Sequence, residues 1–227
     1  MKRRDGVEDV RAMGQEIVFT GKGRVELQHF DQEPLGQTEV RGRTVVSLIS
    51  PGTELAWLND GNYPLRPGYA AIFKAEELGA SVRGVAKGDL LLCMGGHRSI
   101  QCFDEKYTIK VPPNLPAAQA VIARLMGVSM TTLMTTMARP GDIVLICGAG
   151  PVGYLAAHQF AHCGYDVTVI EPDVSRQEQM RSSGIQKVLS AVPVGDAAYD
   201  GKVALVVDCS GHEKAVLDGC KVVRKKG

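Results

Sequence analysis

The second half of the chain alternates short apolar runs with helical stretches, and this pattern constrains the fold more than any other feature. Two of the runs, IVLIC (143–147) and VALVV (203–207), are apolar at every position. A strand of that kind is buried on both faces, as in a parallel sheet covered by helices. The pattern predicts further strands at 167–170 and 187–189, and helices from 151, near 174–182 and near 212–223.

The residues before this region have a different pattern. Short β-type runs separated by Gly, Pro and Asp predict a β-rich barrel or sandwich over 13–117. A hairpin is expected from 16–20 and 24–30 around a GKG turn, with further strands at 43–49, 70–75, 89–93 and 106–111. Residues 117–138 contain Gly127 but no other turn residue, and they predict one or two helices that open a second domain at 118–227.

Composition restricts the class of protein. Of the 227 residues, 44% are hydrophobic and 22% are charged, which indicates a packed core. The net charge of +1 gives no reason to expect nucleic acid or a membrane surface as a partner. The charged start is not a secretory signal, and no apolar run approaches the ~20 residues that cross a bilayer. Six scattered cysteines suit reduced core thiols in a cytoplasmic protein better than a disulfide framework. The expected partner is a small-molecule substrate, and a homo-oligomer is left open.

A glycine-rich turn follows the first fully apolar run. Gly148-Ala149-Gly150-Pro151-Val152-Gly153 fits the G-x-G-x-x-G pattern between a buried strand and a helix. Gly148 permits the tight turn, Gly150 lets backbone N–H groups approach a pyrophosphate, and Gly153 lets the helix lie close to the strand. The positive end of the helix dipole also favours phosphate, so the turn predicts a dinucleotide site.

Residues at the ends of the next strands extend this prediction. Glu171 ends the second apolar strand, where it can accept hydrogen bonds from the adenosine ribose and repel a 2′-phosphate, which favours NAD over NADP. Arg176 could instead reach a phosphate, so NADP stays open. Cys209 and Ser210 follow VALVV at the same sheet edge, where Ser210 either contributes to the cofactor site or caps the next helix.

Several motifs together resemble the medium-chain dehydrogenase/reductase superfamily, zinc-type alcohol dehydrogenase-like. These are the β-rich region, the helix, R-P-G-D and strand-GAGPVG, together with SPGTE (50–54) and PGYAAIFKAEELGASVRGVAKGDLLL (67–92). The resemblance covers 13–227 and implies an N-terminal GroES-like domain followed by a Rossmann-type doubly wound parallel sheet. Residues 1–12 match nothing in it and are expected to be an upstream extension or a cloning remnant.

The departures from the family pattern concern the catalytic metal. Zinc members place a cysteine where this chain has Pro51, and His-Glu where it has Tyr69-Ala70. Proline cannot bind a metal, and neutral tyrosine is a poor zinc ligand. Cys93, His97 and Cys102 lie near one another in sequence, but two apolar thiols and a loop histidine are favoured over a metal site. The resemblance therefore implies a zinc-independent branch.

Without a metal, a side chain has to move the proton in carbonyl chemistry. Thr53 matches a proton-relaying hydroxyl of zinc relatives, and Tyr69 replaces a ligand in the same cleft. His97 titrates nearest neutral pH, while Glu54 is either catalytic or orients its turn through backbone hydrogen bonds. Packing in a turn or wall is the alternative for each. Residues 59–63 are expected to form a loop over the cleft.

Two other patterns are interpreted as structural. His158 and His162 share a helix face, but position 159 is Gln, so the base of H-E-x-x-H is missing and a half-exposed helix flank is expected. The methionines at helical spacing are expected to pack in a core; they are Met126, Met130, Met134 and Met137.

The chain stops just after the helix near 212–223, where the resembled fold continues with further strands. The Rossmann sheet is therefore expected to be incomplete, with VALVV as an unpaired edge that favours aggregation or pairing with another chain.

Three hypotheses about the function follow from the sequence. The first is an NAD(H)-dependent, zinc-independent alcohol/carbonyl oxidoreductase, whose activity in this shortened form is open. The alternatives are an NADPH-dependent quinone or enone reductase and a non-catalytic dinucleotide-binding module.

Overall fold

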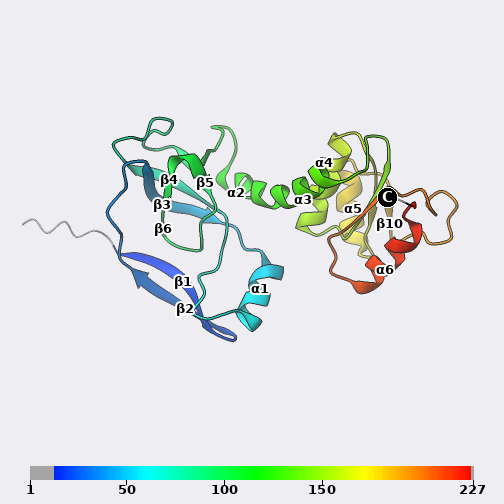
Figure 1. The fold of residues 1–227 in the computed structure, drawn as a ribbon, viewed down its shortest axis with the longest axis horizontal. Coiled ribbons are helices and arrows are strands. Elements are labelled where there is room, and N and C mark those ends of the chain that lie inside the picture. The colour runs from blue at the N-terminus through cyan, green and yellow to red at the C-terminus, as the bar shows by residue number, and fades with distance from the viewer. Residues whose placement is uncertain (1–12, 226–227) are drawn as a thin grey trace, which may run out of the picture. The chain divides into compact units, whose positions relative to one another are not determined.

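The computed structural model describes residues 13–225, so the predicted extension at residues 1–12 lies outside the described part. The chain divides into two compact units: the first ends at Ile122, and the second begins at Ala123. Figure 1 shows the elements of each unit, which are described separately below.

The first unit is built from antiparallel strands, as the sequence predicts. The expected hairpin is present as β1 (Gly14–Gly21) and β2 (Arg24–Phe30). A five-stranded sheet has the order β6-β3-β4-β5-β7, and every neighbouring pair in it is antiparallel. Its strands are β3 (Glu39–Ser47), β4 (Ala71–Leu78), β5 (Leu90–Cys93), β6 (Ile100–Asp104) and β7 (Ile109–Lys110).

Two parts of this unit differ from the sequence prediction. The segment expected to be a turn and a loop is the helix α1 (Pro51–Asp60), which begins with proline at its first position, where the missing N–H costs nothing. The strand expected at 106–111 is shortened to β7, because the Asp104 side chain accepts the Lys106 N–H and turns the chain into the 3-10 helix η1 (Glu105–Tyr107). Strand β6 was not predicted from the sequence.

The second unit has the predicted alternation of parallel strands and helices. The sheet order is β10-β9-β8-β11, and each neighbouring pair is parallel. Its strands are β8 (Ile143–Cys147), β9 (Asp166–Ile170), β10 (Val188–Leu189) and β11 (Leu205–Asp208). Its main helices are α4 (Pro151–His162), α5 (Val174–Ser182) and α6 (Glu213–Val222).

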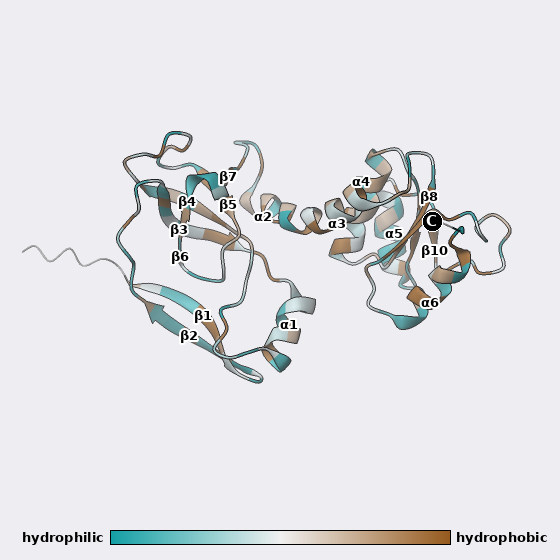
Figure 2. Ribbon diagram, in the orientation of Figure 1, coloured by the Kyte–Doolittle hydropathy of each residue, from teal (hydrophilic) through white to brown (hydrophobic). Residues whose placement is uncertain are grey.

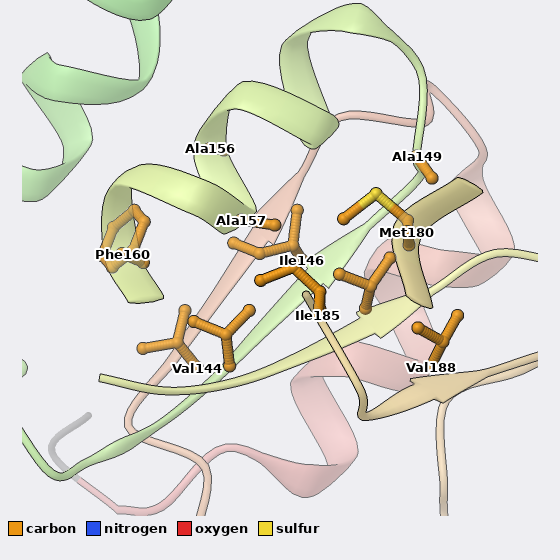
Figure 3. Close-up of a cluster of buried hydrophobic side chains, with 11 residues drawn as sticks. Val144, Ile146, Ala149, Ala156, Ala157, Phe160, Met180, Ile185 and Val188 are labelled. Carbon is orange, nitrogen blue, oxygen red and sulfur yellow. The ribbon is translucent and has the colours of Figure 1, made fainter. Parts of the chain in front are cut away.

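One cluster of buried side chains joins the central strands to the helices on one face of this sheet. Val144 and Ile146 project from β8 toward Phe160 of α4, and Met180 of α5 completes the cluster (Figure 3). All four of these residues are 0% exposed. This cluster fixes α4 against the strand that precedes the glycine-rich turn.

The other face of the sheet is covered in part by α6, which has both hydrophobic and hydrophilic residues along its surface (Figure 2). Gly219 lets this helix approach β11 closely, since a Cβ there would lie 2.9 Å from Cγ1 of Val206. Strand β11 is the last strand in the sheet order of the described residues.

The helical region before β8 differs from two predictions. It consists of α2 (Ala117–Ala120) and α3 (Ala123–Thr135). The interpretation of the four methionines as core residues is wrong: all are exposed, Met134 to 79%. The stretch Ala117–Thr135 is also apolar and long enough to cross a membrane by length and composition, contrary to the sequence expectation. It is the only such stretch among residues 13–225, and a core helix of a soluble protein passes the same test.

Candidate functional site

The glycine-rich turn after β8 adopts a backbone that side chains would obstruct. Gly148 has a φ of +96°, in the region that favours glycine, and its N–H donates to the Ile170 carbonyl oxygen at 2.7 Å. A Cβ on Gly153 would lie 1.9 Å from the Gly148 oxygen. By contrast, a Cβ on Gly150 would meet no atom within 4 Å. Gly148 and Gly153 are therefore needed for internal packing, while Gly150 faces open space.

The same turn presents the beginning of α4. Gly150 is the N-cap residue and offers no capping side chain, and Pro151 stands at the first helical position, followed by Val152. The N–H groups of a first helical turn have no partner inside the helix, and the helix dipole adds partial positive charge. A phosphate at this position would be bound by backbone N–H groups, as the sequence predicts.

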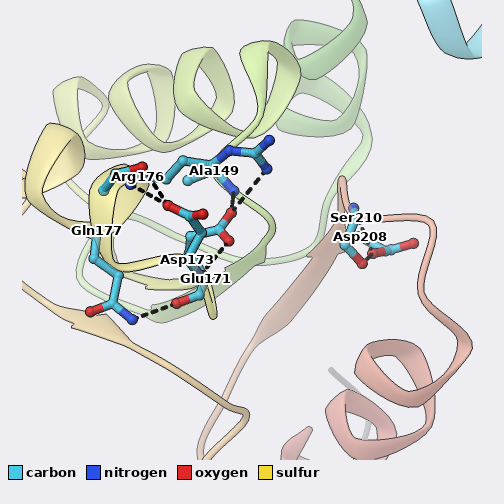
Figure 4. Close-up of polar contacts among 8 residues, drawn as sticks. Ala149, Glu171, Asp173, Arg176, Gln177, Asp208 and Ser210 are labelled. Atoms are coloured by element: carbon cyan, nitrogen blue, oxygen red, sulfur yellow. Dashed lines mark hydrogen bonds and ion pairs between the residues drawn. The ribbon is translucent and has the colours of Figure 1, made fainter.

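Glu171 ties the glycine-rich turn to the adjacent strand end (Figure 4). Its Oε2 accepts the Ala149 N–H at 2.8 Å, and its Oε1 accepts the Asp173 N–H at 3.0 Å. The residue is only 3% exposed. A carboxylate oxygen has two lone-pair sites, so each oxygen keeps one acceptor position beyond its backbone partner. Glu171 thus has a structural role that the sequence did not reveal, and it retains capacity for a ligand hydroxyl.

Arg176 and Asp173 lie beside Glu171 at the start of α5. The Arg176 guanidinium nitrogen is 3.8 Å from Glu171 Oε2, and its side chain is 56% exposed. Asp173 caps α5 by accepting the Arg176 N–H at 3.0 Å. This hydrogen bond lowers the pKa of Asp173, after the larger effect of the Ser175 hydroxyl. Arg176 is thus anchored by its backbone, while its half-exposed guanidinium lies beside the Glu171 carboxylate.

These residues line a cavity of about 590 Å³ at the carboxyl edge of the parallel sheet, which we call the glycine-loop cavity. Such edges are where ligands bind in open α/β sheets. Of the residues predicted from sequence to bind a cofactor, those that line it are Gly148, Gly150, Glu171, Arg176, Cys209 and Ser210. Pro151, Val152 and Gly153 do not line it and instead form the first turn of α4.

The opposite wall of the cavity follows β11. Ser210 does not cap α6, because the N-cap residue of this helix is His212. The Ser210 hydroxyl donates to Asp208 and accepts the His212 N–H at 3.1 Å. Cys209 donates its N–H to the Cys147 carbonyl oxygen at 2.8 Å. Burial raises the pKa of both thiols to about 11. The two cysteines therefore act as small apolar wall residues at neutral pH.

The first unit brings two of the predicted catalytic residues into direct contact. His97 Nε2 lies 2.9 Å from Glu54 Oε2, and both side chains are 9% exposed. Glu54 Oε1 accepts the Ser50 N–H at 2.8 Å, so the orienting role considered for Glu54 is also present. The other ring nitrogen of His97, Nδ1, lies 2.8 Å from the Ser47 hydroxyl oxygen. Ser47 had no sequence motif to mark it, and the sequence analysis missed it.

The other two predicted catalytic residues are Thr53, which lies in helix α1, and Tyr69, which packs against that helix. Thr53 is exposed in the first turn of α1, next to Glu54. Tyr69 is half-buried and packs edge-on against Trp57 of α1, with ring centroids 6.2 Å apart. The structure therefore joins His97 with Glu54, while Thr53 and Tyr69 flank them.

The three residues considered as a metal site have other partners. His97 is occupied by Glu54 and Ser47, while Cys93 donates to the Ala71 carbonyl oxygen and Cys102 to Glu39. Burial raises the pKa of Cys93 to about 12, which disfavours the thiolate that zinc needs. Within residues 13–225, no group of three or more His, Cys, Asp or Glu side chains could hold a metal ion.

Sequence comparisons match parts of this chain to known proteins. Residues 144–201 match the family model of the TrkA-N domain. An (R,R)-butanediol dehydrogenase of Neisseria gonorrhoeae is 27% identical over 93 residues, which are 41% of this chain and 26% of that protein. Across the curated relatives, the matches cover 26% to 46% of the relatives' own length.

Comparisons of structure show the fold over nearly the whole chain. Acetophenone reductase of Geotrichum candidum in complex with NAD has a TM-score of 0.83 at 19% identity, with 96% of this chain and 74% of that chain covered. CAD from Helicobacter pylori complexed with NADP(H) has a TM-score of 0.81 at 15% identity, with 95% and 74% covered.

The solved structures agree with the order of a β-rich unit and a Rossmann-type unit. The chain is thus similar in sequence to zinc-type alcohol dehydrogenase-like proteins, and it has the two-part GroES-like and Rossmann-type fold of the medium-chain dehydrogenases/reductases.

Proposed function

We propose that this chain is an NAD(H)-dependent oxidoreductase that transfers a hydride between the nicotinamide and an alcohol/carbonyl pair without catalytic zinc. The observation that carries the proposal is the glycine-loop cavity, where Gly150 leaves open space at the beginning of α4. A Cβ would fill the space that a pyrophosphate needs, and backbone N–H groups would bind its charge. The bound nicotinamide supplies or accepts the hydride, and the side chains of this chain supply orientation and proton transfer.

The preference for NAD rests on Glu171. Its buried carboxylate keeps an acceptor position on each oxygen, which suits the two hydroxyls of an adenosine ribose. A 2′-phosphate at the same place would be repelled by the carboxylate charge. Arg176 supports the second candidate, an NADPH-dependent quinone or enone reductase, because its exposed guanidinium could bind a 2′-phosphate.

Zinc independence is supported by the donor set. Pro51 and Tyr69 occupy the positions where zinc relatives have ligands, and the His97 ring nitrogens face Glu54 and Ser47. The residues present therefore do not fit a catalytic zinc. The expected result is activity that survives dialysis against a chelator, with less than one zinc per chain by elemental analysis.

Calorimetric titration of the full chain with NADH and NADPH tests the cofactor. NADH is expected to bind more tightly than NADPH, and Arg176→Ala is expected to weaken NADPH binding while leaving NADH binding nearly unchanged. Tighter binding of NADPH that depends on Arg176 would favour the reductase candidate. Absence of binding by either nucleotide would refute the whole proposal.

A panel of alcohols, aldehydes, ketones and quinones, followed by nicotinamide absorbance, tests the reaction. Nucleotide binding without turnover of any substrate would favour a non-catalytic dinucleotide-binding module. Turnover of quinones but of no alcohol or ketone would instead favour the reductase candidate.

A further inference from the structure

The contacts of His97 form a continuous hydrogen-bonded chain of three side chains from distant segments. Ser47 ends β3, Glu54 lies in the first half of α1, and His97 lies in the segment between β5 and β6. Ser47 and Glu54 are separated from His97 by 50 and 43 residues. A hydroxyl, an imidazole and a carboxylate in this order are the parts of a proton relay.

The hydrogen-bond acceptors define the direction in which these three side chains donate their protons. A carboxylate only accepts, and Glu54 Oε1 already accepts the Ser50 N–H. The Nε2 of His97 therefore carries the proton donated to Glu54 Oε2. In that tautomer Nδ1 has a free lone pair, so it accepts the Ser47 O–H. The buried carboxylate would also stabilise an imidazolium formed when His97 takes a proton.

The surrounding backbone holds the three groups in place. The pairing of β3 with β4 shifts register between Thr44 and Val46, which makes Val45 the extra residue of a β-bulge. With this bulge, Thr44 and Ser47 both contact the segment that carries His97. The Thr44 hydroxyl donates to the Arg98 carbonyl oxygen at 2.6 Å, and Ser47 contacts His97. Bulges that redirect a side chain are over-represented beside active sites.

A buried glutamine supports the segment that carries His97. Gln101 is 0% exposed, and its amide nitrogen donates to the Gly96 carbonyl oxygen at 2.9 Å and to the Thr44 hydroxyl at 3.1 Å. The Gly68 backbone packs against the same segment, since a Cβ there would lie 2.7 Å from the His97 nitrogen. His97 is thus fixed by backbone contacts on both sides.

Ser47 is half-buried, and so is His97 as a whole residue, while the side chains of His97 and Glu54 are each 9% exposed. Both ring nitrogens of His97 are already occupied by Ser47 and Glu54. With its proton directed at His97, the Ser47 oxygen keeps acceptor lone pairs for an incoming hydroxyl. The open end of the relay is therefore a serine hydroxyl, and the closed end is a carboxylate held by the Ser50 N–H.

We propose that Ser47 is the catalytic residue that exchanges the proton with the substrate oxygen, and that His97 and Glu54 act through it as positioning residues. This inference rests on the proposed oxidoreductase function. During oxidation, the alcohol proton passes to Ser47 Oγ as the Ser47 proton passes to His97 Nδ1. The C–H bond breaks, its electron pair leaves as hydride to bound NAD⁺, and the products are the carbonyl compound, NADH and a proton on His97.

Kinetics of Ser47→Ala in the full chain test the catalytic part. We expect kcat to fall about 100-fold or more, the usual range for loss of a general acid or base, while the Kd for NADH stays unchanged. Ser47→Thr, which keeps a hydroxyl, is expected to recover much of kcat. Ser81→Ala is the matched control, because Ser81 is an exposed serine of the same unit, between β4 and β5, with no part in the relay. Wild-type kcat in Ser47→Ala would overturn the proposal.

Nitrogen-15 NMR of the imidazole separates this inference from the proposed function. In the wild type, His97 is expected as the Nε2–H tautomer with a hydrogen-bonded Nδ1. Ser47→Ala is expected to shift the Nδ1 resonance, unlike Ser81→Ala. An unchanged Nδ1 resonance would overturn the relay even in a chain without turnover. If the shift occurs but the wild type turns over no substrate, the hydrogen-bonded chain stands, and both the oxidoreductase function and the catalytic role of Ser47 are refuted.

Discussion

The two candidate sites of this molecule are built in opposite ways. In the second unit, the glycine-rich turn beside the cavity is a backbone site: Gly148 and Gly153 are packed against main-chain atoms, and Gly150 leaves open space. In the first unit, the site consists of side chains, with Ser47, His97 and Glu54 joined by hydrogen bonds. The backbone site occupies a few consecutive residues, while the side-chain site joins three distant segments.

This difference affects how each site responds to change. A backbone site fails when an atom is added, because its groups are already in close contact. A side-chain site fails when one partner is removed, because a buried donor or acceptor then loses its hydrogen bond. Substitutions in the two units should therefore have different signatures. The four predictions that follow, three on substitutions with their controls and one on thiol reactivity, run from the largest expected effect to the smallest.

The largest effect is expected at Gly153. Gly153→Ala would place a Cβ 1.9 Å from the Gly148 oxygen, so the turn or α4 has to move. Overpacking of this kind typically costs about 1–3 kcal/mol, and the displaced N–H groups should abolish NADH binding. Thermal unfolding and calorimetry measure the two effects.

Gly150→Ala is the matched control for this substitution. Its Cβ meets no atom of the protein within 4 Å, so the melting temperature should stay close to wild type. NADH binding should still weaken by at least about tenfold, or ~1.4 kcal/mol, because the methyl group enters the phosphate space. Equal destabilisation by both alanines would contradict the division of roles among these glycines.

Thiol reactivity gives the next largest effect. Burial raises the pKa of Cys209 to about 11, so at pH 8 only about a thousandth of this thiol is ionised. Its alkylation should be on the order of a hundredfold slower than that of exposed Cys163, and should rise about tenfold per pH unit up to pH 10. Mass spectrometry of the alkylated peptides gives both rates, and NADH should slow Cys209 alone. Faster reaction of Cys209 than Cys163 at pH 8 would contradict its description as a buried wall residue.

Glu171→Gln tests the link between the glycine-rich turn and β9. The glutamine side chain has one acceptor oxygen where the carboxylate has two, so it can accept only one of the Ala149 and Asp173 N–H groups. The other N–H group should then face the NH₂ group, which should lower the free energy of unfolding by about 1–3 kcal/mol. Urea unfolding is expected to show this loss, with weaker NADH binding by calorimetry. Exposed Glu178, on the same helix as Arg176, provides the control Glu178→Gln, for which no comparable loss is expected.

The smallest effects compare two glutamates of the first unit. Glu54→Gln disrupts a buried acceptor of His97 and should destabilise the unit by about 1–3 kcal/mol without changing NADH affinity. Glu76→Gln removes a more exposed ion pair with Arg43, for which about 0–1 kcal/mol is typical. Urea unfolding of both variants checks the order. A larger loss for Glu76→Gln would show that the Glu54 contact adds little to stability.

Much of the second unit was predictable because its signals are local. IVLIC is apolar at every position, as a strand buried on both faces requires, and it is the mostly buried strand β8. VALVV is apolar too, but only its last three residues lie in β11, where they are half-buried. The glycine spacing marked a turn that needs a positive φ at Gly148, a local requirement of the backbone. The methionines of α3 were misjudged because helical spacing shows that residues share a face but not whether anything covers it.

The sequence by itself determined the order of a β-rich unit and a parallel α/β unit, and the glycine turn with its carboxylate partner Glu171. Those features follow from periodicity and from residues a short distance apart. Only the tertiary structure decided that Glu171 holds the turn through two N–H groups, and that Ser47 meets His97 opposite Glu54. The reason is physical: a hydrogen bond depends on positions in space within about 3 Å, and strand pairing and a β-bulge set those positions across 50 residues of chain.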